Sequence, residues 1–270
     1  MNFSIKQFFS GLLRVLHLLS FAEKLRYRYF WIKYFFKNKK YKLNNPELIY
    51  PPINLVYETF GRTSYELFFE SGKKAAKSIK KIYTSLSDNQ TPTILEWGCG
   101  VGRIISNLKS EFPNSKIYGS DVDEKMIDWC KKVYREIIFT KNDYHPPTIF
   151  SDDYFDFVYA PSVFTHLTEI YQREWLAEIL RILKPGGLFL FTVHGDYYAK
   201  KKLTSSEMKK YDSGEIVVRA NVKLGSRIMA VFQGEKFMMN VLLKDFNVVK
   251  HIKDSEYQIA GSQEIWVIKK

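Results

Sequence analysis

The sequence predicts an α/β fold in which a mostly parallel sheet carries helices on both of its faces. Two observations lead to this prediction. From Thr93 onwards, short apolar runs alternate with helical stretches, a pattern typical of consecutive βαβ units. The first run, Thr93–Leu95, is followed by glycines at positions 98, 100 and 102, and together they predict a strand, a tight turn and the start of a helix. That order is the plan of a nucleotide-binding site.

Composition predicts one large domain with an extension. The chain has 270 residues, of which 46% are hydrophobic and 16% aromatic, enough for a sizeable core. Its two cysteines, Cys99 and Cys130, match neither a disulfide framework nor a metal-binding spacing, so we expect a cytoplasmic protein without a metal site. Residues 1–42 contain ten Lys or Arg and one acid, Glu23, and so account for +9 of the net charge of +12. The body therefore lacks the charge expected for broad nucleic-acid binding.

The N-terminal extension, residues 1–45, is predicted to be helical and basic. Met1–Phe21 has the periodicity of an amphipathic helix, and Arg14 interrupts it before it could span a membrane. Tyr27–Tyr41 mixes aromatic and cationic residues, as segments at membrane interfaces do. Two interpretations remain open, a lid packed on the domain or peripheral contact of residues 1–42 with a membrane.

Residues 46–92 are predicted to form a linker and a cap helix, and residues 93–270 the main domain. The linker is marked by Pro46, Pro51 and Pro52, and the helix is expected over Tyr65–Leu86. Strands are expected at Ile94–Trp97, Ile117–Asp121, Ile137–Thr140, Phe157–Ala160, Gly187–Val193, Phe246–Ile252 and Glu264–Ile268, with a hairpin over Glu215–Val222 and Ser226–Phe232. Helices are expected from Gly102 and over Glu124–Arg135, Thr168–Leu183 and Lys236–Lys244.

The glycine turn and Asp121 together predict a ligand with a ribose. Glycines can turn with positive φ and let a ligand approach the backbone. A dinucleotide fingerprint, G-x-G-x-x-G, would place its third glycine at position 103, where Arg103 stands, so an NAD-dependent oxidoreductase is disfavoured. Asp121 ends the second strand, 19 residues beyond Gly102. A carboxylate there can accept both ribose hydroxyls, although it could instead cap the helix that begins near Glu124.

The run from Glu96 to Gly102, E-x-G-x-G-x-G, resembles the first motif of class I S-adenosylmethionine-dependent methyltransferases. Three further runs, DFVYAPSVFTHL, LKPGG and the final GSQEIWVIKK, are similar to a bacterial branch of that family. The resemblance covers about residues 47–270. It departs from the family at Trp97, where Val or Ile is usual, and residues 1–42 have no counterpart.

This resemblance implies a Rossmann-like fold with a seven-stranded, mostly parallel sheet whose last strand is reversed. It also implies that S-adenosylmethionine is the cofactor. The residues implied in cofactor binding are Glu96, Gly98, Cys99, Gly100, Gly102, Arg103, Asp121, Val122 and, near the adenine, Asn142 or Asp143.

His166, just after the fourth strand, is the candidate base for a hydroxyl acceptor, because histidine titrates near neutral pH. It could instead cap the helix that follows, and His145 and His194 are weaker candidates. Methyltransferases of exocyclic base amines resemble one another in having Asn or Asp, two prolines and an aromatic after the fourth strand. This chain has APSV at that place, so methylation of a base amine is disfavoured.

We therefore expect a methyltransferase of a small-molecule, glycan or lipid-linked acceptor, with oxygen favoured over nitrogen. The alternatives are an RNA methyltransferase and a non-catalytic binding protein.

Overall fold

The computed structural model describes residues 19–220, 228–253 and 257–270. The helix predicted over residues 1–21 therefore lies almost entirely outside the described residues, as does the centre of the predicted hairpin.

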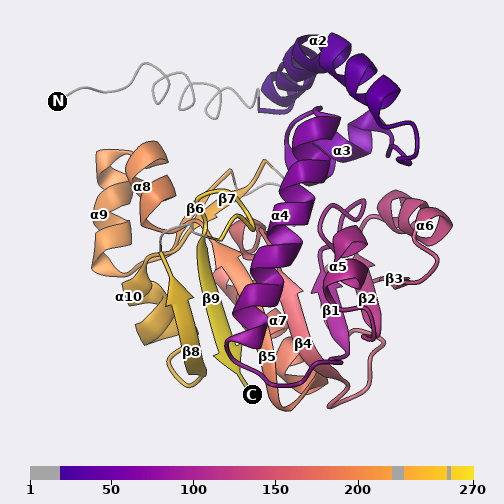
Figure 1. Cartoon of the computed structure of the whole chain (residues 1–270). Helices are drawn as coiled ribbons and strands as arrows, with labels where there is room; N and C mark the ends of the chain where they lie inside the picture. Colours follow the sequence, from indigo (N-terminus) through magenta and orange to yellow (C-terminus); the bar gives the residue numbers. More distant parts are fainter. Residues whose placement is uncertain (1–18, 221–227, 254–256) are drawn as a thin grey trace.

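A seven-stranded sheet with the order β3-β2-β1-β4-β5-β9-β8 runs through the centre of the molecule (Figure 1). The strands are β1 (Ile94–Trp97), β2 (Ile117–Asp121), β3 (Ile138–Lys141), β4 (Phe155–Ala160), β5 (Leu183–Val193), β8 (Asn247–Ile252) and β9 (Glu264–Lys269). The first five are parallel to one another, and β9 is antiparallel to both of its neighbours. The predicted sheet with a reversed last strand is confirmed.

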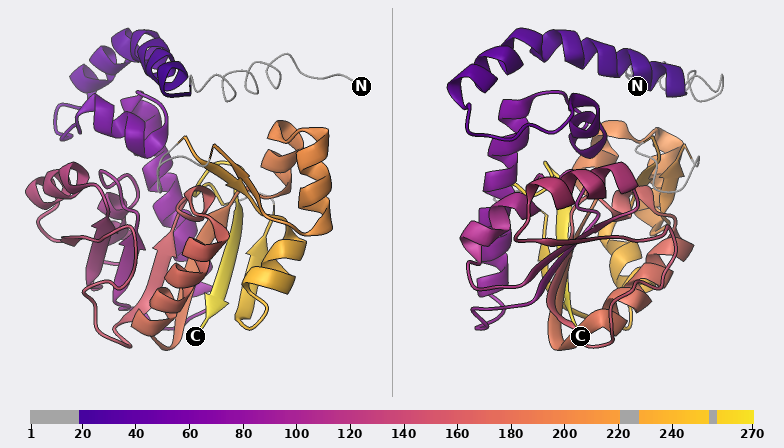
Figure 2. Two further views of the ribbon diagram at one scale, coloured as in Figure 1. Left: turned by 180° about the vertical axis from the view of Figure 1, so that it is seen from behind. Right: turned by 90° about the vertical axis from the view of Figure 1, so that its right-hand side faces the viewer.

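Helices cover both faces of the sheet because successive strand residues point to opposite sides. One apolar core lies between the sheet and the helices α4 (Tyr65–Thr84), α5 (Ile105–Glu111) and α6 (Glu124–Val133). A second core lies on the other face, beneath α7 (Glu169–Ile182), α10 (Glu235–Phe237) and the π-helix η2 (Met238–Leu242). Figure 2 shows α7 and α4 on opposite sides of the sheet. Along β4, Phe157 and Tyr159 belong to the first core, and Val158 and Ala160 to the second.

From residue 19 to residue 92 the structure describes three helices, of which the sequence predicted two, one in the N-terminal extension and the cap helix. The cap helix is α4, and its N-cap Ser64 accepts a hydrogen bond from the Leu67 N–H at 3.3 Å. The cationic-aromatic segment lies within one longer helix, α2 (Leu19–Asn44), and the supposed linker contains a short helix, α3 (Ile53–Phe60). Within the described ranges, no helix is long and apolar enough to cross a bilayer.

The region between β5 and β8 differs most from the predictions. The hairpin exists, but its strands β6 (Val217–Arg219) and β7 (Ala230–Phe232) are short. Two helices that were not predicted, α8 (Asp196–Lys202) and α9 (Ser205–Ser213), precede it. The start of α9 is a capping box formed by Thr204 and Glu207, a signal that the T-S-S-E run carried. The helix predicted over Lys236–Lys244 is present as α10 and the π-helix η2, which follow one another directly and end at Leu242.

The LKPGG run bulges within β5, which begins at Leu183, four residues before the predicted start at Gly187. Leu183 pairs with Phe155 and Leu188 pairs with Phe157, so five residues of β5 advance while β4 advances by two. Gly186 permits the bulge because it adopts a φ of +79°.

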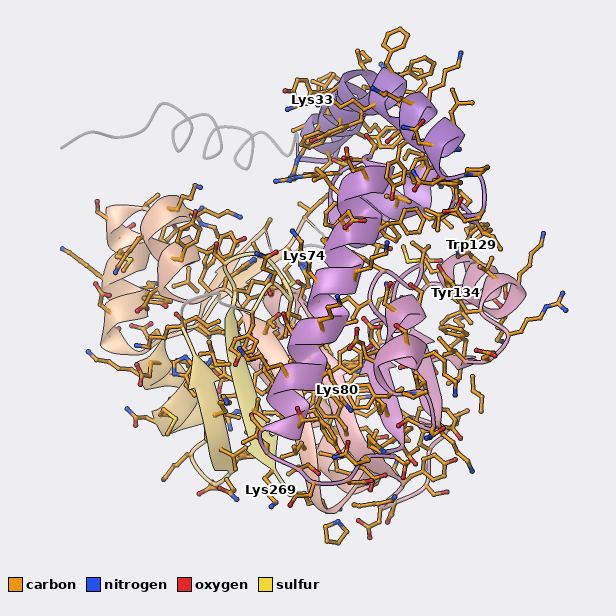
Figure 3. All side chains as sticks on the ribbon, viewed as in Figure 1. Lys33, Lys74, Lys80, Trp129, Tyr134 and Lys269 are labelled. Atoms are coloured by element: carbon orange, nitrogen blue, oxygen red, sulfur yellow. The ribbon has the colours of Figure 1, made fainter. Side chains whose placement is uncertain are left out.

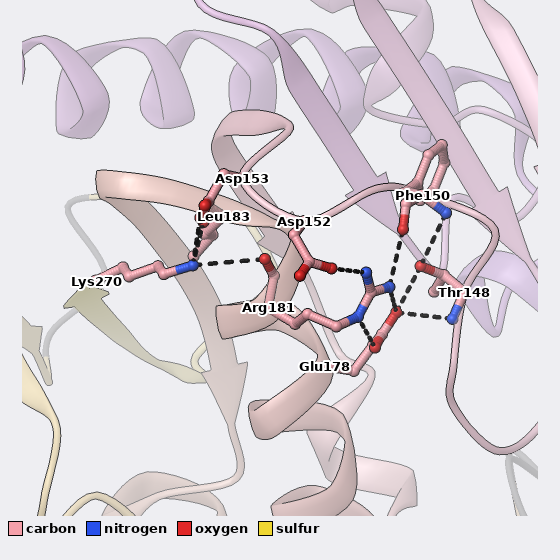
Figure 4. Close-up of polar contacts among 8 residues, drawn as sticks. All are labelled: Thr148, Phe150, Asp152, Asp153, Glu178, Arg181, Leu183 and Lys270. Atoms are coloured by element: carbon pink, nitrogen blue, oxygen red, sulfur yellow. Dashed lines mark hydrogen bonds and ion pairs between the residues drawn. The ribbon is translucent and has the colours of Figure 1, made fainter.

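The edge of the sheet at which the parallel strands begin is closed by ion pairs (Figure 4). Arg181, at the end of α7, donates to Glu178 Oε2 at 2.8 Å, to Asp152 Oδ1 at 2.6 Å and to the Phe150 carbonyl at 2.9 Å. Glu178 also accepts from the Thr148 N–H at 2.7 Å. These contacts tie the loop before β4 to α7.

Candidate functional site

A cavity of about 840 Å³ lies at the opposite edge, where β1, β2, β3 and β4 end. Its walls come from the loops that follow these strands and from α3 and the beginning of α2. None of the described α4 residues lines it, so the predicted capping role of α4 falls to α3. An open α/β sheet binds its ligands at this edge, and the volume is in the range of small-molecule sites.

The glycine turn adopts the predicted backbone conformation. Gly98, Gly100 and Gly102 have φ values of +79°, +55° and +84°, in the region that side chains with a Cβ rarely adopt. Gly98 and Gly100 line the cavity.

Contacts with other side chains also require these glycines. A Cβ on Gly98 would lie 2.5 Å from Val163 Cγ2, one on Gly100 would lie 2.5 Å from Thr59 Cγ2, and one on Gly102 would meet the Tyr134 ring at 2.6 Å. The Tyr134 ring belongs to the segment after α6 (Figure 3). The Cβ positions are thus closed by the protein's own side chains, and it is the backbone beside them that borders the cavity.

Asp121 and Val122 lie in the cavity wall. The Asp121 carboxylate accepts from the Gly100 N–H at 2.8 Å through Oδ2 and from the Asp123 N–H at 2.9 Å through Oδ1. Burial raises the pKa of Asp121, and these two backbone bonds oppose the rise. A carboxylate can accept about four hydrogen bonds, so each oxygen retains the capacity to accept from a ligand. Asp123, not Asp121, is the N-cap of α6.

Asn142 and Asp143 also line the cavity. The Asn142 side chain is 8% exposed, and its Nδ2 donates to the Asp143 carbonyl at 2.7 Å. Its Oδ1 is buried without a hydrogen-bond partner within the described part of the chain. A buried polar atom without a partner carries a desolvation cost of about 1–3 kcal/mol, which a donor group on a ligand would remove.

Four of the predicted cofactor residues lie outside the cavity lining, namely Glu96, Cys99, Gly102 and Arg103. Glu96 is 3% exposed and accepts from the Tyr159 hydroxyl at 2.7 Å. Burial raises its pKa to about 8, against the opposing effects of that bond and of the Arg103 charge. Arg103 donates to the Ile259 carbonyl at 3.0 Å. Glu96 and Arg103 thus make these contacts within the protein and not at the cavity.

Two described histidines line the cavity, His166 and His194. His166 Nδ1 lies 2.6 Å from the Met229 carbonyl. A carbonyl only accepts, so Nδ1 donates and the neutral ring carries its basic lone pair on Nε2. His166 ends a short 3-10 helix, η1 (Phe164–His166), and the N-cap of α7 is Thr168, so His166 is not the cap. Burial lowers the pKa of His194 to about 3, with nearby Lys202 and His166 adding to the effect. His145 is outside the lining and pairs with Glu174 at 3.5 Å.

Sequence reasoning missed several residues of the cavity wall. Thr59, in α3, accepts from the Val101 N–H at 3.2 Å and so ties α3 to the glycine turn. Ser162 has a positive φ of 64°, and its N–H donates to Thr192 Oγ1 at 2.8 Å. Gln263 Nε2 donates to Ser162 Oγ at 2.9 Å. Thr59 carries no sequence signal, and Gln263 lies in the final GSQEIWVIKK run without being marked as a site residue, because each reaches the site only through the fold. A non-glycine residue held at positive φ often indicates a functional constraint.

Metal chemistry receives no support from the described residues, in which no group of three or more His, Cys, Asp or Glu side chains is arranged to hold a metal ion.

Comparison with known proteins agrees with this geometry. Residues 94–187 match the family model described as a methyltransferase domain. The chain is 30% identical over 144 residues to a tRNA N(3)-methylcytidine methyltransferase of Schizosaccharomyces pombe, covering 50% of this chain and 58% of that protein. It is 33% identical over 103 residues to a sterol 24-C-methyltransferase of the same yeast, covering 36% and 26%. The chain thus spans less than two thirds of the length of either relative.

Among solved structures, an S-adenosylmethionine-dependent methyltransferase of Methanosarcina mazei superposes with a TM-score of 0.54. It is 20% identical, and the match covers 70% of this chain and 96% of that one. At 20% identity, this similarity is evidence for a shared fold only. Residues 94–187 of the chain are therefore similar to a methyltransferase domain, and the sheet and helices have the Rossmann-like fold of the S-adenosylmethionine-dependent methyltransferases.

Proposed function

We propose that the chain is an S-adenosylmethionine-dependent methyltransferase. The observation that carries this proposal is the cavity at the carboxyl edge of the methyltransferase-type sheet, in which Gly98, Gly100, Asp121 and Asn142 meet. When bound, S-adenosylmethionine would supply a methyl group on an electrophilic sulfonium. The chemistry left to the protein is mainly positioning.

Each of these residues fits a part of the cofactor. The remaining acceptor capacity of Asp121 suits the two ribose hydroxyls, and the backbone at Gly98 and Gly100 suits the amino-acid end. Asn142 is favoured over Asp143 for the adenine amino group, because its buried Oδ1 has no other partner among the described residues. Val122 is proposed to contact the nucleoside from the cavity wall. Glu96, Cys99, Gly102 and Arg103 would act through the shape of the turn.

For the acceptor we propose a hydroxyl group on a small molecule, a glycan or a lipid-linked compound. His166 lines the cavity, and its bond to the Met229 carbonyl leaves Nε2 as the basic atom. It would take the hydroxyl proton as the new bond to carbon forms. His194 is a poor candidate, because a histidine with a pKa of about 3 is a weak base. The bacterial branch suggested by the SVFTHL and LKPGG runs belongs to this proposal, as do a cytoplasmic location and peripheral membrane contact through residues 1–42.

An RNA methyltransferase is the second candidate, favoured by the identity of 30% with the tRNA-modifying protein of yeast. A methylation assay with bulk tRNA and tritiated S-adenosylmethionine separates the two. Label transferred to tRNA would replace the hydroxyl proposal.

Titration calorimetry with S-adenosylmethionine tests the cofactor site. We expect saturable heat from the wild type and at least about 100-fold weaker binding by Asp121→Ala, because two hydrogen bonds to a charged acceptor contribute about 1.5–3 kcal/mol each. Asp121→Asn, which retains one acceptor oxygen, should lose less and serves if the alanine variant does not fold. Asp128→Ala, at an exposed position on α6, is the matched control and should bind normally. Absence of heat with the wild type, or equal heat from all variants, contradicts the site.

A further inference from the structure

Helix α2 has an inner face that packs on the protein and an outer apolar face that is exposed in the part of the chain the structure describes. The inner face carries Glu23, Tyr27, Asn38 and Tyr41. Tyr27 packs edge-on against the Tyr57 ring with centroids 5.1 Å apart. The Asn38 amide donates to the Thr63 carbonyl at 2.6 Å. These contacts seat α2 on α3 and on the beginning of α4, as the views in Figures 1 and 2 also show.

The opposite face carries an apolar stripe, here called the outer stripe, made of Leu25, Ile32, Phe36 and Leu43. The four positions are seven, four and seven residues apart, so they share one side of the helix. Their exposed fractions are 49%, 68%, 78% and 73%. Eight of the seventeen exposed large hydrophobic residues in the described chain lie on this helix. Apolar exposure concentrated in this way marks an interaction surface.

Cations flank the outer stripe on both sides. Eight Lys or Arg residues of α2 are exposed, and its one acid, Glu23, faces inward to accept from the Tyr57 hydroxyl at 2.9 Å. The exposed cations are Lys24, Arg26, Arg28, Lys33, Lys37, Lys39, Lys40 and Lys42. Figure 3 shows side chains projecting from α2 beyond the body of the molecule, with Lys33 labelled. The outer stripe with cations on both sides is complementary to a surface that has negative charge outside and an apolar interior below it.

We propose that the outer stripe of α2 docks the protein on the surface of an anionic lipid bilayer. Aliphatic residues such as Ile32 and Leu43 make few favourable contacts with the phosphate backbone of a nucleic acid. At the boundary of the acyl chains of a bilayer they leave water, which lowers the free energy of the bound state. Pairing of two α2 helices through this face would bring together two surfaces that each carry seven excess positive charges, which is unfavourable. Lipid headgroups provide the complementary charge.

Docking would also place the cavity beside the bilayer. Glu23, Lys24 and Tyr27 line the cavity from the same helix that carries the outer stripe, and a helix with its side chains is about 10 Å across. On the proposed function, this position favours an acceptor that is itself carried on a lipid.

Flotation with vesicles of phosphatidylcholine, with and without phosphatidylglycerol, tests the docking of the full chain. We expect flotation with the anionic vesicles and its loss at high salt, because screening shortens the reach of charge from about 10 Å at 0.1 M to about 3 Å at 1 M. Ile32→Ser with Phe36→Ser should lower the partition coefficient by at least about tenfold. Lys33→Gln and Lys40→Gln should lower it by about fivefold each.

The matched control replaces two exposed isoleucines elsewhere, Ile149→Ser with Ile170→Ser, whose exposed fractions are 79% and 69%. It should float like the wild type. Absence of flotation by the wild type, or equal flotation by the Ile32/Phe36 variant, overturns the proposal.

Two other partners would overturn the proposal as well. One is a second copy of the chain, shown by a dimer in light scattering that the Ile32/Phe36 variant does not form. The other is RNA, shown by binding of bulk tRNA that is lost in the same variant. Calorimetry with S-adenosylmethionine on the same variants keeps the two proposals apart. Cofactor binding without flotation refutes the docking alone, and flotation without cofactor binding refutes the proposed function alone.

Discussion

At the edge where the parallel strands begin, Arg181 forms ion pairs with Glu178 and Asp152. At the same edge, Lys270 donates to Asp153 Oδ1 at 2.6 Å and to the Leu183 carbonyl at 2.7 Å. At the edge where the strands end, the backbone turns at positive φ, the Asn142 Oδ1 lacks a partner in the described chain and a cavity remains.

The difference is instructive because both edges belong to the same strands. Bonds that satisfy every charge stabilise the fold and leave nothing for a ligand, whereas groups left with spare bonding capacity cost stability and can bind. The comparison predicts that matched substitutions at the two edges will behave differently.

The largest difference is expected between Gly98→Ala and Gly186→Ala, since both glycines have a φ of +79°. A Cβ at Gly186 would meet only Lys269 Cε at 3.8 Å, whereas one at Gly98 would lie 2.5 Å from Val163 Cγ2. We expect a loss of about 1 kcal/mol in the free energy of unfolding for Gly186→Ala. For Gly98→Ala we expect about 3 kcal/mol, because overpacking is added to the backbone cost.

Urea unfolding measures both losses. Equal losses would show that the Val163 side chain can move away from the added Cβ without lowering the free energy of unfolding. The turn at Gly98 would then be no more constrained than the bulge in β5.

The second comparison makes the same substitution at two buried glutamates, Glu178→Gln and Glu96→Gln. Burial would raise the pKa of Glu178, but hydrogen bonds from Arg181 and Thr148 lower it overall, so it is ionised at pH 7. Replacing it should cost about 2 kcal/mol, because the bonds to a charged partner are weakened. Glu96, with a pKa of about 8, is mostly protonated at pH 7, and a neutral amide should cost less than about 1 kcal/mol.

The pH dependence at Glu96 has a definite sign. A carboxyl whose pKa is higher in the folded state contributes stability at low pH and loses that contribution as the pH rises towards about 8. The free energy of unfolding of Glu96→Gln, relative to that of the wild type, should therefore be higher at pH 8.5 than at pH 6. A variant that loses more at the higher pH would show that Glu96 is ionised in the fold.

The third comparison concerns acid at the cavity edge, through His194. Its folded pKa of about 3 lies below the unfolded value of about 6.5. Its contribution to stability is therefore complete above about pH 6.5 and is lost as the pH falls towards 3. Between pH 7 and pH 5 this group should cost the wild type about 2 kcal/mol, and His194→Asn should lack that part of the decline.

His145→Asn is the control for His194→Asn, because the His145 side chain is 58% exposed and should leave the decline unchanged. Parallel declines in the wild type and His194→Asn would show that His194 is not kept neutral by burial.

Much of the fold was predictable because its signals are local. Alternating apolar runs located the strands of the main sheet, and the glycines at 98, 100 and 102 located the turn. The predictions failed where the local signal was ambiguous. Helix α3 follows two prolines and was assigned to a linker, and α8 lies in a lysine-rich stretch without a clear apolar period.

The candidate site was predictable only in part. Asp121 and the Asn142–Asp143 pair could be named as candidates because Asp121 ends β2 and the pair directly follows β3. Thr59 and Gln263 were missed because they reach the cavity from positions far away in the sequence. Conversely, Glu96 lies in a recognisable motif, yet its carboxylate points to Tyr159, a neighbour from another strand.

By itself, the sequence determined the strands of the main sheet, the positive-φ turn and the methyltransferase resemblance, since these depend on residues close together in the chain. Only the tertiary structure decided which side chains face the cavity and which face of α2 is left uncovered. Burial and bonding capacity depend on neighbours from distant segments, and the periodicity of a helix does not reveal which of its faces the protein will cover.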